Sequence, residues 1–353
     1  MPAIPNGSLI LVTGVNGYIG SHVAEQLLEH GFRVRGTVRD AYKAEYMRAI
    51  FDEKYGKDAF EVRTVEDMAT SGAFDDVMKG CTGVMHVASD LTLNPDPHKV
   101  IPMVVSGVQN VLAAAAREPS VKRFVFTSSS AAATPPISNK RFHVDAETWN
   151  DEEIEVAWAP PPYNDDRKLA VYAASKTLAE KECWRFMQEE KPSFVLNTVL
   201  PNCNIGRILS EDQPASTGGW YKKLWEGDEE ILDLLWNFPP QHFVNTTDTA
   251  LLHLAALREE DVVGERLLAF AGPFNFNDTV DVLEKIQADG FGDGSKRFTK
   301  ISSTAKDLKI VDTKRSQELL RRYNRPGFAS LEESLKEVVE SCRVFAQKRS
   351  LQG

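Results

Sequence analysis

The sequence contains few cysteines, and their spacing excludes the usual zinc and disulfide patterns. Among 353 residues there are four, Cys81, Cys183, Cys203 and Cys342, and no two of them form a Cys-x-x-Cys pair. Structural zinc sites need closely spaced cysteines, and disulfide-rich secreted domains are small and cysteine-dense. We therefore predict no metal site, and thiols that stay reduced in the cytosol.

The sequence also lacks a long hydrophobic run, and it lacks basic residues at its N-terminus. We find no apolar run near the roughly 20 residues that cross a bilayer. The first seven residues contain no lysine or arginine, and the apolar stretch after them is only Leu9 to Val12. These features predict neither a signal peptide nor a membrane partner, and they favour a cytoplasmic location.

Positive charge is scarce as well. Lys and Arg number 41 against 51 Asp and Glu, which gives a formal net charge of −10. No basic cluster offers a track for a phosphate backbone, so nucleic acid is not an expected partner. With 42% hydrophobic and 26% charged residues, the composition is that of an ordinary globular protein. This length suits one large and one small domain.

The first 130 residues alternate short β-branched runs with segments of helical periodicity, and a further strand is expected later in the chain. Such alternation requires right-handed crossovers and a parallel sheet covered on both faces. We therefore predict an α/β fold, a Rossmann-type doubly wound parallel sheet. The predicted strands are 9–12, 33–39, 60–65, 84–88, 123–127 and 194–200, and the predicted helices lie near 19–28, 43–55, 98–116 and 167–190.

A glycine-rich loop follows the first predicted strand and opens the first helix. Gly14, Gly17 and Gly20 have Gly-x-x-Gly-x-x-Gly spacing. A dinucleotide site needs glycines for a tight turn, for close approach of the backbone to the pyrophosphate, and for helix packing. The alternative is a structural turn with incidental glycines. The residues expected to contact the cofactor here are Gly14, Asn16, Gly17, Tyr18, Ile19 and Gly20.

The end of the second strand indicates which dinucleotide binds. An NAD site uses a carboxylate for the ribose 2′-hydroxyl, whereas an NADP site uses a cation for the 2′-phosphate. Arg39 ends this strand and Lys43 follows one turn later, so both can pair with a phosphate. Asp40 is the one argument for NAD, and a solvated edge is the other alternative. We predict NADPH/NADP+ as the cofactor.

Tyr172 and Lys176 lie one helical turn apart on the same face of a predicted helix. A phenol has a pKa near 10 and is a poor acid–base group unless its anion is stabilised. The Lys176 ammonium and the oxidised nicotinamide would lower that pKa. Tyr172 would then donate a proton to a carbonyl oxygen, and Lys176 would hold the nicotinamide ribose. Taken alone, the spacing also fits an ordinary surface helix.

Hydroxyl residues follow the predicted strand 123–127. Ligands of open parallel sheets bind at this carboxyl edge, where Ser129 can hydrogen-bond the substrate oxygen beside the tyrosine. Serines at strand ends are also common turn formers.

Together these motifs resemble the dihydroflavonol reductase and cinnamoyl-CoA reductase branch of the extended short-chain dehydrogenases/reductases. Within it, the chain looks like the microbial NADPH-dependent carbonyl, aldehyde and methylglyoxal reductases. The likeness runs from Leu9 to about Gln347 and is strongest before residue 205. The segments that carry it are 14–20, 34–40, 65–68, 86–89, 126–129 and 172–176.

The resemblance implies further roles. Ser129 is the active-site serine, with Ser128 as its nearest competitor. The segment 145–149 matches an acidic-x-x-Trp patch before the active-site helix, and 131–139 does not match the loop by which plant members recognise polyphenols. The implied cofactor contacts are Asp67 and Met68 at the adenine, Val87, Ala88 and Thr127 along the cofactor, Pro201 and Asn202 at the nicotinamide, and Ser216 and Thr217. The implied pocket residues are Ser130, Phe238 and Gln241.

The pattern changes after residue 200. A polar, loop-like stretch at 202–219 precedes helical segments at 220–236, and an amphipathic helix is expected at 330–347. We predict an NADP-binding Rossmann domain at 1–200, to which segments near 243–258 return, and a smaller, mostly helical substrate-binding domain at 201–353.

Other side chains allow two interpretations. His86 and His242 could bind a metal or act as bases, but a core position is the better interpretation of His86. Trp220, Trp225 and Trp236 fit a pocket wall and a core stripe equally well.

The predicted function is NADPH-dependent reduction of a small-molecule aldehyde or ketone to an alcohol. One alternative is a nucleotide-sugar epimerase or dehydratase on the same fold, which would retain NAD and need basic groups for a diphosphate. A non-enzymatic NADP-sensing protein is a more remote alternative. The acidic segment 226–233 and Arg39 favour the reductase. Monomer and dimer both remain open.

Overall fold

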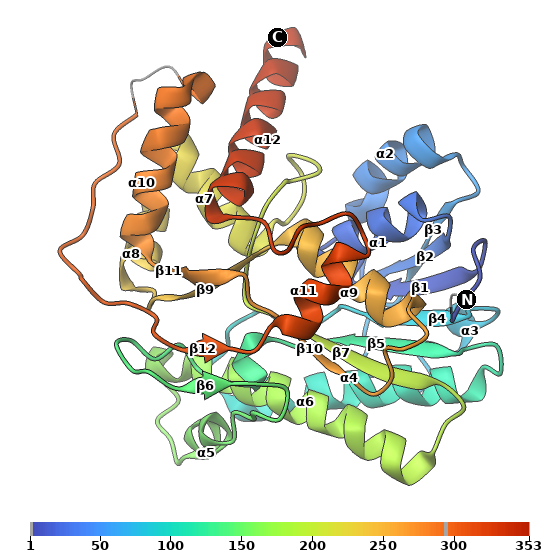
Figure 1. The fold of residues 1–353 in the computed structure, drawn as a ribbon. Coiled ribbons are helices and arrows are strands. Elements are labelled where there is room, and N and C mark those ends of the chain that lie inside the picture. The colour runs from blue at the N-terminus through green and yellow to red at the C-terminus, as the bar shows by residue number, and fades with distance from the viewer. Residues whose placement is uncertain (1–2, 293–295, 353) are drawn as a thin grey trace.

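The structure, a computed structural model, describes residues 3–292 and 296–352. Its centre is a seven-stranded parallel sheet with the order β3-β2-β1-β4-β5-β7-β10 (Figure 1). This arrangement confirms the predicted Rossmann-type fold. The strands are β1 (Leu9–Thr13), β2 (Arg33–Val38), β3 (Phe60–Thr64), β4 (Gly83–His86), β5 (Arg123–Thr127), β7 (Val195–Pro201) and β10 (Arg266–Ala269).

The central strands are buried on both faces because helices cover the sheet from both sides. Ile10, Leu11 and Val12 of β1 are completely buried, as expected of a continuous apolar run in a parallel sheet. The helices on one face are α1 (Tyr18–Glu29), α2 (Glu45–Tyr55), α9 (Thr246–Arg258) and α11 (Lys314–Arg321), and those on the other are α3 (Asp75–Met78), α4 (Pro97–Arg117) and α6 (Lys168–Glu190).

Helix α4 differs from the expectation that no segment is long and apolar enough to cross a membrane. It is long and apolar enough to cross a membrane by length and composition, although polar residues interrupt its apolar run. Half of its most apolar window is buried inside the protein, where Val104, Val108 and Leu112 join the core beneath the sheet. Core helices of soluble proteins pass the same test, so packing explains the apolarity of α4.

A second, smaller layer lies beyond the carboxyl edge of the large sheet. Its three-stranded sheet has the order β11-β9-β8 and shares a core with four helices. The stretch 202–219, expected to be a loop, contains the short strand β8. This segment forms a strand because the side chains of Cys203 and Ile205 are buried in the core of the smaller layer. The elements are β8 (Cys203–Ile205), α7 (Ser216–Glu226), α8 (Glu230–Asn237), β9 (Gln241–Asn245), β11 (Gly272–Phe274), α10 (Phe276–Ile286) and α12 (Leu331–Gln352).

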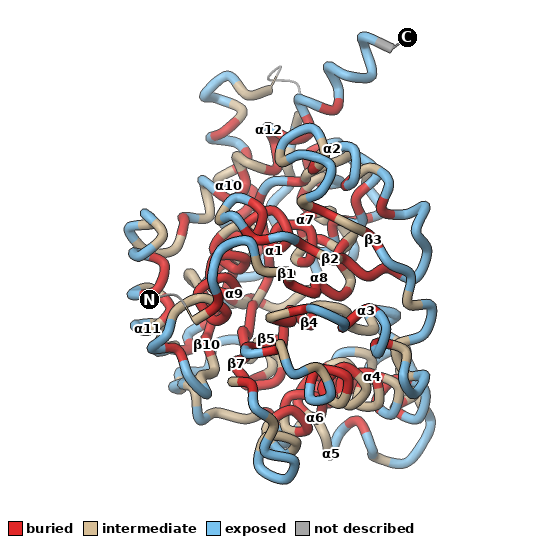
Figure 2. Tube along the Cα trace, turned by 90° about the vertical axis from the view of Figure 1, so that its right-hand side faces the viewer, coloured by how far each residue is buried: buried red, intermediate tan, exposed pale blue. Residues whose placement is uncertain are grey.

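The chain returns to the large sheet after residue 200. Helix α9 packs beside α1, and β10 pairs with β7 at the edge of the sheet. Figure 2 shows buried residues running through the sheet and the inner helix faces. The remaining elements are the short helices η1 (Ala41–Ala44), η2 (Ser130–Ala132), η3 (Asp165–Arg167), η4 (Gln287–Phe291) and α5 (Glu152–Trp158), and the strands β6 (His143–Val144) and β12 (Ile310–Val311), which pair with each other.

Candidate active site

The strand order reverses between β1 and β4, which are neighbours in the sheet. From β1 the chain builds outward through β2 and β3, and from β4 through β5, β7 and β10 on the other side. In open α/β sheets, ligands bind outside the carboxyl ends of the strands at such a switch point. The glycine loop after β1 and the serines after β5 both lie at this edge.

The glycine loop forms a cradle that larger residues could not build. Gly14 has a φ of +62°, and a Cβ there would lie 2.9 Å from the Cα of Ala88. A Cβ at Gly20 would lie 2.3 Å from the Gly14 carbonyl oxygen, so helix α1 meets the loop backbone directly. Gly17 is the capping residue just before α1 and provides no side-chain hydrogen bond to the helix. The positive end of α1 is therefore open to an anionic group.

Thr13 ties β1 to β4 beneath this cradle. Its Oγ1 accepts hydrogen bonds from the backbone amides of Val87 and Ala88, both at 3.0 Å, and lies 2.8 Å from Nδ1 of His86. Burial lowers the pKa of His86 to about 3, with a smaller contribution from the charge of Lys176. His86 is thus a neutral core residue that fixes the strand ends, in agreement with the core position preferred for it over a metal-binding or basic role.

The cations at the end of β2 face solvent. Arg39 and Lys43 are exposed, and neither side chain has a hydrogen-bond or ion-pair partner within the part of the chain that the structure describes. Asp40 is already engaged, since its carboxylate accepts from the backbone amide of Tyr42 at 3.1 Å and caps η1. The Tyr46 hydroxyl donates to the Asn16 carbonyl at 2.8 Å and holds α2 against the glycine loop.

These residues fit a dinucleotide. The cradle at Gly14 is free of side chains, and the start of α1 can receive a pyrophosphate. The Oγ atom of Ser89, just after β4, is buried and has no partner among the described residues. Buried polar atoms are normally hydrogen-bonded, so this atom marks a place for a ligand or water.

Helix α6 carries Lys176 to the end of β5. Its Nζ is buried and donates to the carbonyl oxygen of Thr127 at 2.9 Å, and it lies 5.2 Å from the ring centroid of Phe126. Burial lowers the pKa of Lys176 to about 8, while the negative charge of Glu180 opposes that shift. A lysine with this pKa can exchange a proton near neutral pH.

Tyr172 lies one turn earlier on α6, beside Ser129. Burial raises the pKa of Tyr172, and a hydrogen bond with the Ser129 side chain lowers it. The expected lowering by Lys176 does not set this pKa, because the Lys176 ammonium is directed at the Thr127 carbonyl. The Oγ of Ser129 also accepts from the amide of Ala131 at 3.2 Å, which orients it at the start of η2.

Ser128 and Ser129 have different partners. The Ser128 hydroxyl donates to the buried carboxylate of Glu180 at 2.6 Å, on the inner side of α6. Ser129 is the hydroxyl that interacts with Tyr172. Ser130 begins η2. The geometry thus separates the two candidates for the active-site serine.

Other predicted contacts have local partners. The Asp67 carboxylate accepts from the amide of Ala69 at 2.8 Å and from the Thr70 hydroxyl at 3.1 Å, which closes its own turn. Met68 packs against Gly107 of α4. The Asn202 side chain accepts from the amide of the next residue at 2.8 Å.

Helix α7 meets the glycine loop. Ser216 is its first residue, and the Thr217 hydroxyl donates to the Asn204 carbonyl at 2.6 Å. Gly218 lies against the ring of Tyr18, where a Cβ would come within 2.5 Å. The start of α7 is therefore close to the loop, and Ser216 and Thr217 stay predicted cofactor contacts.

Phe238 and Gln241 share one pocket between α7, α8, β9 and α10. The Trp220 ring packs against Phe238 at a tilt of 52°, with ring centroids 5.4 Å apart. Trp225 belongs to the core and Trp236 is exposed, so the three tryptophans do not act together. The sequence interpretation missed the wall from β11 and α10. The pocket is lined by Trp220, Tyr221, Leu235, Phe238, Pro239, Gln241, Phe274, Asn275, Phe276 and Thr279.

His242, by contrast, is held in the core. Its Nδ1 lies 2.8 Å from the Asp307 carboxylate, which also accepts from Lys309 Nζ at 2.8 Å. All three side chains are buried, so His242 does not face a site at this end of β9.

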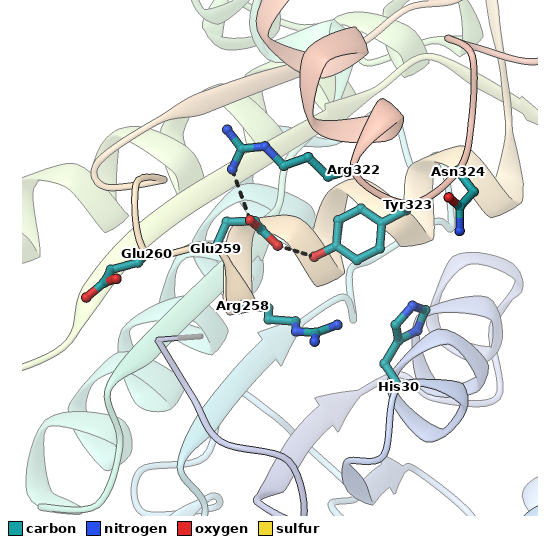
Figure 3. Close-up of a pocket in the computed structure, with 7 residues that line it drawn as sticks. All are labelled: His30, Arg258, Glu259, Glu260, Arg322, Tyr323 and Asn324. Atoms are coloured by element: carbon teal, nitrogen blue, oxygen red, sulfur yellow. Dashed lines mark hydrogen bonds and ion pairs between the residues drawn. The ribbon is translucent and has the colours of Figure 1, made fainter. Parts of the chain in front are cut away.

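A separate cavity of about 470 Å³ lies near the amino ends of the strands, far from the glycine loop along α1 (Figure 3). It opens between His30, which caps the end of α1, and Arg258, the last residue of α9. Glu259 accepts from Arg322 at 2.9 Å and from the Tyr323 hydroxyl at 2.7 Å. Arginine and glutamate side chains both line this cavity.

The geometry defines a nucleotide-binding sheet with a tyrosine–lysine pair, and the comparisons with known proteins agree. The model of the NAD dependent epimerase/dehydratase family matches residues 10–205. The chain belongs to this family, which confirms its predicted place among the extended short-chain dehydrogenases/reductases.

Relatives and solved structures with similar architecture cover nearly the whole chain. Aldehyde reductase 2 from Sporidiobolus salmonicolor is 43% identical over 96% of this chain and 97% of that protein. A protein from Aspergillus terreus named as an NAD-dependent epimerase/dehydratase is 42% identical over 96% of this chain and 98% of that protein. A yeast methylglyoxal/isovaleraldehyde reductase complexed with NADPH has a TM-score of 0.77 at 24% identity, over 96% of this chain and 99% of that chain. These names include both NAD and NADPH, so the choice between the two cofactors rests on the residues at the end of β2, Arg39 and Lys43.

Proposed function

We propose that this chain is an NADPH-dependent carbonyl reductase that converts a small aldehyde or ketone to an alcohol. The observation that carries the proposal is the meeting of Ser129, Tyr172 and Lys176 at the carboxyl edge of β5, beside the glycine cradle. The aldehyde reductase named above supports the reaction class, because it matches this chain over nearly its full length.

NADPH, when bound, supplies the hydride for the carbonyl carbon. Tyr172 donates its phenolic proton to the carbonyl oxygen, and Ser129 hydrogen-bonds the same oxygen. Burial raises the pKa of Tyr172, so the phenol carries its proton before the reaction, and the interaction with Ser129 opposes that shift. Lys176 places positive charge at the end of β5 and, through its bond to the Thr127 carbonyl, holds α6 against the sheet.

The cofactor would be held along the carboxyl edge. Gly14, Gly17 and Gly20 would take the pyrophosphate, and Arg39 and Lys43 the 2′-phosphate. The other proposed contacts are Asn16, Tyr18, Ile19, Asp67, Met68, Val87, Ala88, Thr127, Pro201, Asn202, Ser216 and Thr217. In this proposal residues 1–200 form the NADP-binding domain, to which segments near 243–258 return, residues 201–353 mainly bind substrate but also supply the last four of these cofactor contacts, and the enzyme is cytoplasmic.

Replacing Arg39 by alanine should weaken NADPH binding far more than NADH binding. The exposed guanidinium has no competing partner in the described chain, so it is free to pair with the 2′-phosphate. Loss of a charge-assisted contact costs about 1.5–3 kcal/mol, or roughly ten- to a hundredfold in Kd. Fluorescence titration with both cofactors measures this. Arg33→Ala, at the amino end of the same strand, is the control, and equal losses for NADPH and NADH would refute the assignment.

Substitutions at Phe238 and Gln241 should change substrate size preference and the enantiomer ratio of the alcohol. Both side chains line the same aromatic pocket, while Ser130 beside Ser129 is the third proposed contact. The measurement is chiral chromatography of products from a series of ketones of increasing bulk. Val263→Ala, at an exposed position on another face, is the control. Unchanged product ratios on every bulky ketone would remove these residues from the pocket.

The second candidate is a nucleotide-sugar epimerase or dehydratase, which the name of the Aspergillus relative favours. Such an enzyme returns its cofactor to the starting redox state in each turnover. The two are separated by following NADPH oxidation on a panel of aldehydes and ketones, alongside conversion of nucleotide sugars. Stoichiometric NADPH consumption with a carbonyl compound supports the reductase, and nucleotide-sugar conversion without net consumption supports the alternative.

A further inference from the structure

A buried carboxylate lies on the active-site helix and has no part in the mechanism above. Glu180 follows Lys176 by four residues and Tyr172 by eight, and it is completely buried. Burying a carboxylate is costly unless it is paired and hydrogen-bonded. Its position next to Lys176 therefore requires a reason.

The contacts of Glu180 join three strands at the site. Its oxygens accept from the Ser128 hydroxyl after β5 at 2.6 Å and from the Thr198 hydroxyl in β7 at 2.7 Å. Arg266 of β10 donates from Nε at 2.8 Å and from Nη2 at 3.2 Å. Trp184 on α6 adds a longer contact at 3.4 Å. Glu180 thus has partners on both oxygens.

Arg266 is itself held in place by the acidic-x-x-Trp segment that the sequence analysis singled out. Its guanidinium lies 3.7 Å from the ring centroid of Trp149 and donates from Nη1 to the carbonyls of Ala146 at 2.6 Å and Thr148 at 2.8 Å. The next residue, Asn150, donates from its side chain to the Ala131 carbonyl at 2.7 Å. This segment therefore connects the Glu180 pair to the turn that follows Ser129.

We propose that Glu180, anchored by Arg266, is a positioning residue of the reductase site. It holds the Ser128 hydroxyl away from Tyr172, which leaves Ser129 as the hydroxyl beside the phenol, and it places a negative charge one helical turn from Lys176 on α6. The inference rests on the proposed function, because it assigns Glu180 a role in the same site.

Other charges around Lys176 do not replace that of Glu180. His86, from β4, is neutral because burial lowers its pKa to about 3. Cys183, about two turns after Lys176 on α6, is a neutral thiol because burial raises its pKa well above the ordinary value. Asp151 of the α5 segment pairs with Lys181 on the outer side of α6.

Glu182 also lies on that outer side, where it pairs with Arg185. It accepts from Gln109 of α4 at 2.9 Å. Arg266 of β10 reaches Glu180 rather than Lys176. The Glu180 carboxylate is therefore the negative group that acts on Lys176.

The sign of the effect follows from the charge. Burial lowers the pKa of Lys176 to about 8, and Glu180 raises it against that effect. Glu180→Gln removes the charge, so the pKa of Lys176 should fall further, by about one pH unit or more. The ammonium would then be lost at a lower pH, and reductase activity that depends on it should decline at a lower pH.

The test is a ¹³C NMR titration of cofactor-free protein labelled at lysine Cε. The Lys176 signal is assigned by its absence in Lys176→Arg, and its midpoint is compared in the parent, Glu180→Gln and Thr198→Val. We expect a lower midpoint in Glu180→Gln alone, because Thr198→Val removes a hydrogen bond but leaves the charge. Equal midpoints in all three proteins would overturn the proposal, as would an equal decrease in Thr198→Val.

Glu180→Gln leaves a buried guanidinium unpaired and can impair folding. The double variant Glu180→Gln/Arg266→Gln removes both charges and is compared with Arg266→Gln, which keeps the carboxylate. Its midpoint should be lower than that of Arg266→Gln, and equal midpoints in these two variants contradict the proposal. The pH profile of kcat/KM for carbonyl reduction, measured beside the titration, then separates the proposed reductase function from the proposed role of Glu180. If the parent oxidises NADPH with a carbonyl compound but Glu180→Gln leaves the Lys176 midpoint unchanged, the proposed function stands and the inference about Glu180 is wrong. A midpoint change in a protein that reduces no carbonyl compound supports the coupling between Glu180 and Lys176 but contradicts the proposed function, and with it the role of Glu180 in a reductase site.

Discussion

Tyr172→Phe should lose at least about 10²–10⁴-fold in turnover, the usual contribution of a general acid. The substitution keeps the ring and its packing but removes the hydroxyl that interacts with Ser129 and donates the proton. NADPH binding should be nearly unchanged, because the fold and the glycine cradle do not depend on this hydroxyl. Steady-state reduction and fluorescence titration of NADPH, measured on the same preparation, test both parts.

Tyr323→Phe is a matched control for this change. It removes a hydroxyl that donates to Glu259 at the opposite edge of the sheet, so turnover should stay close to that of the parent. If Tyr172→Phe bound NADPH normally and kept turnover within about threefold of the parent, general acid catalysis by this residue would be excluded.

Lys176→Ala should reduce both turnover and NADPH affinity, with turnover falling by about 10²-fold or more. The change removes a buried ammonium from the end of β5, breaks its 2.9 Å bond to the Thr127 carbonyl and leaves Glu180 with less positive charge nearby. The combined loss distinguishes it from Tyr172→Phe, in which cofactor affinity should persist. The measurements are kcat, KM and the Kd for NADPH, with circular dichroism to confirm the fold.

Lys181→Ala provides the control on the same helix. Lys181 lies on the outer side of α6, where it pairs with Asp151, and surface ion pairs contribute little to stability. Its loss should leave kcat and Kd near the parent values. A Lys176→Ala protein with normal NADPH affinity would show that this lysine does not hold the cofactor.

The sheet was predictable because its signal is local. The apolar runs in β1 and in β5, where Phe124 to Phe126 are all apolar, have no polar alternation, which is typical of strands buried on both faces. The expected strand 33–39 differs from β2 by one residue at its end. Strand β8 was missed because it has only three residues and follows a polar asparagine, so its pairing with β9 decides its conformation.

The candidate site was predictable only where spacing or strand ends reveal it. Tyr172 and Lys176 share a helix face, and the interval of four residues shows this directly. Glu180 continues the same face, but a glutamate in a helix usually indicates exposure to solvent. Its partner Arg266 lies 86 residues later, and the two meet because β10 pairs with β7 at the edge of the sheet. No local pattern contains that pairing.

The most direct test of the central claim is deuterium transfer from NADPH labelled at C4 of the nicotinamide. The protein is incubated with an aldehyde and each of the two C4-labelled forms, and the alcohol is analysed by mass spectrometry and NMR. The account predicts deuterium on the carbinol carbon from one form only, at a rate greatly reduced in Tyr172→Phe. An alcohol without deuterium from either form, or no consumption of NADPH with any carbonyl compound, would contradict it.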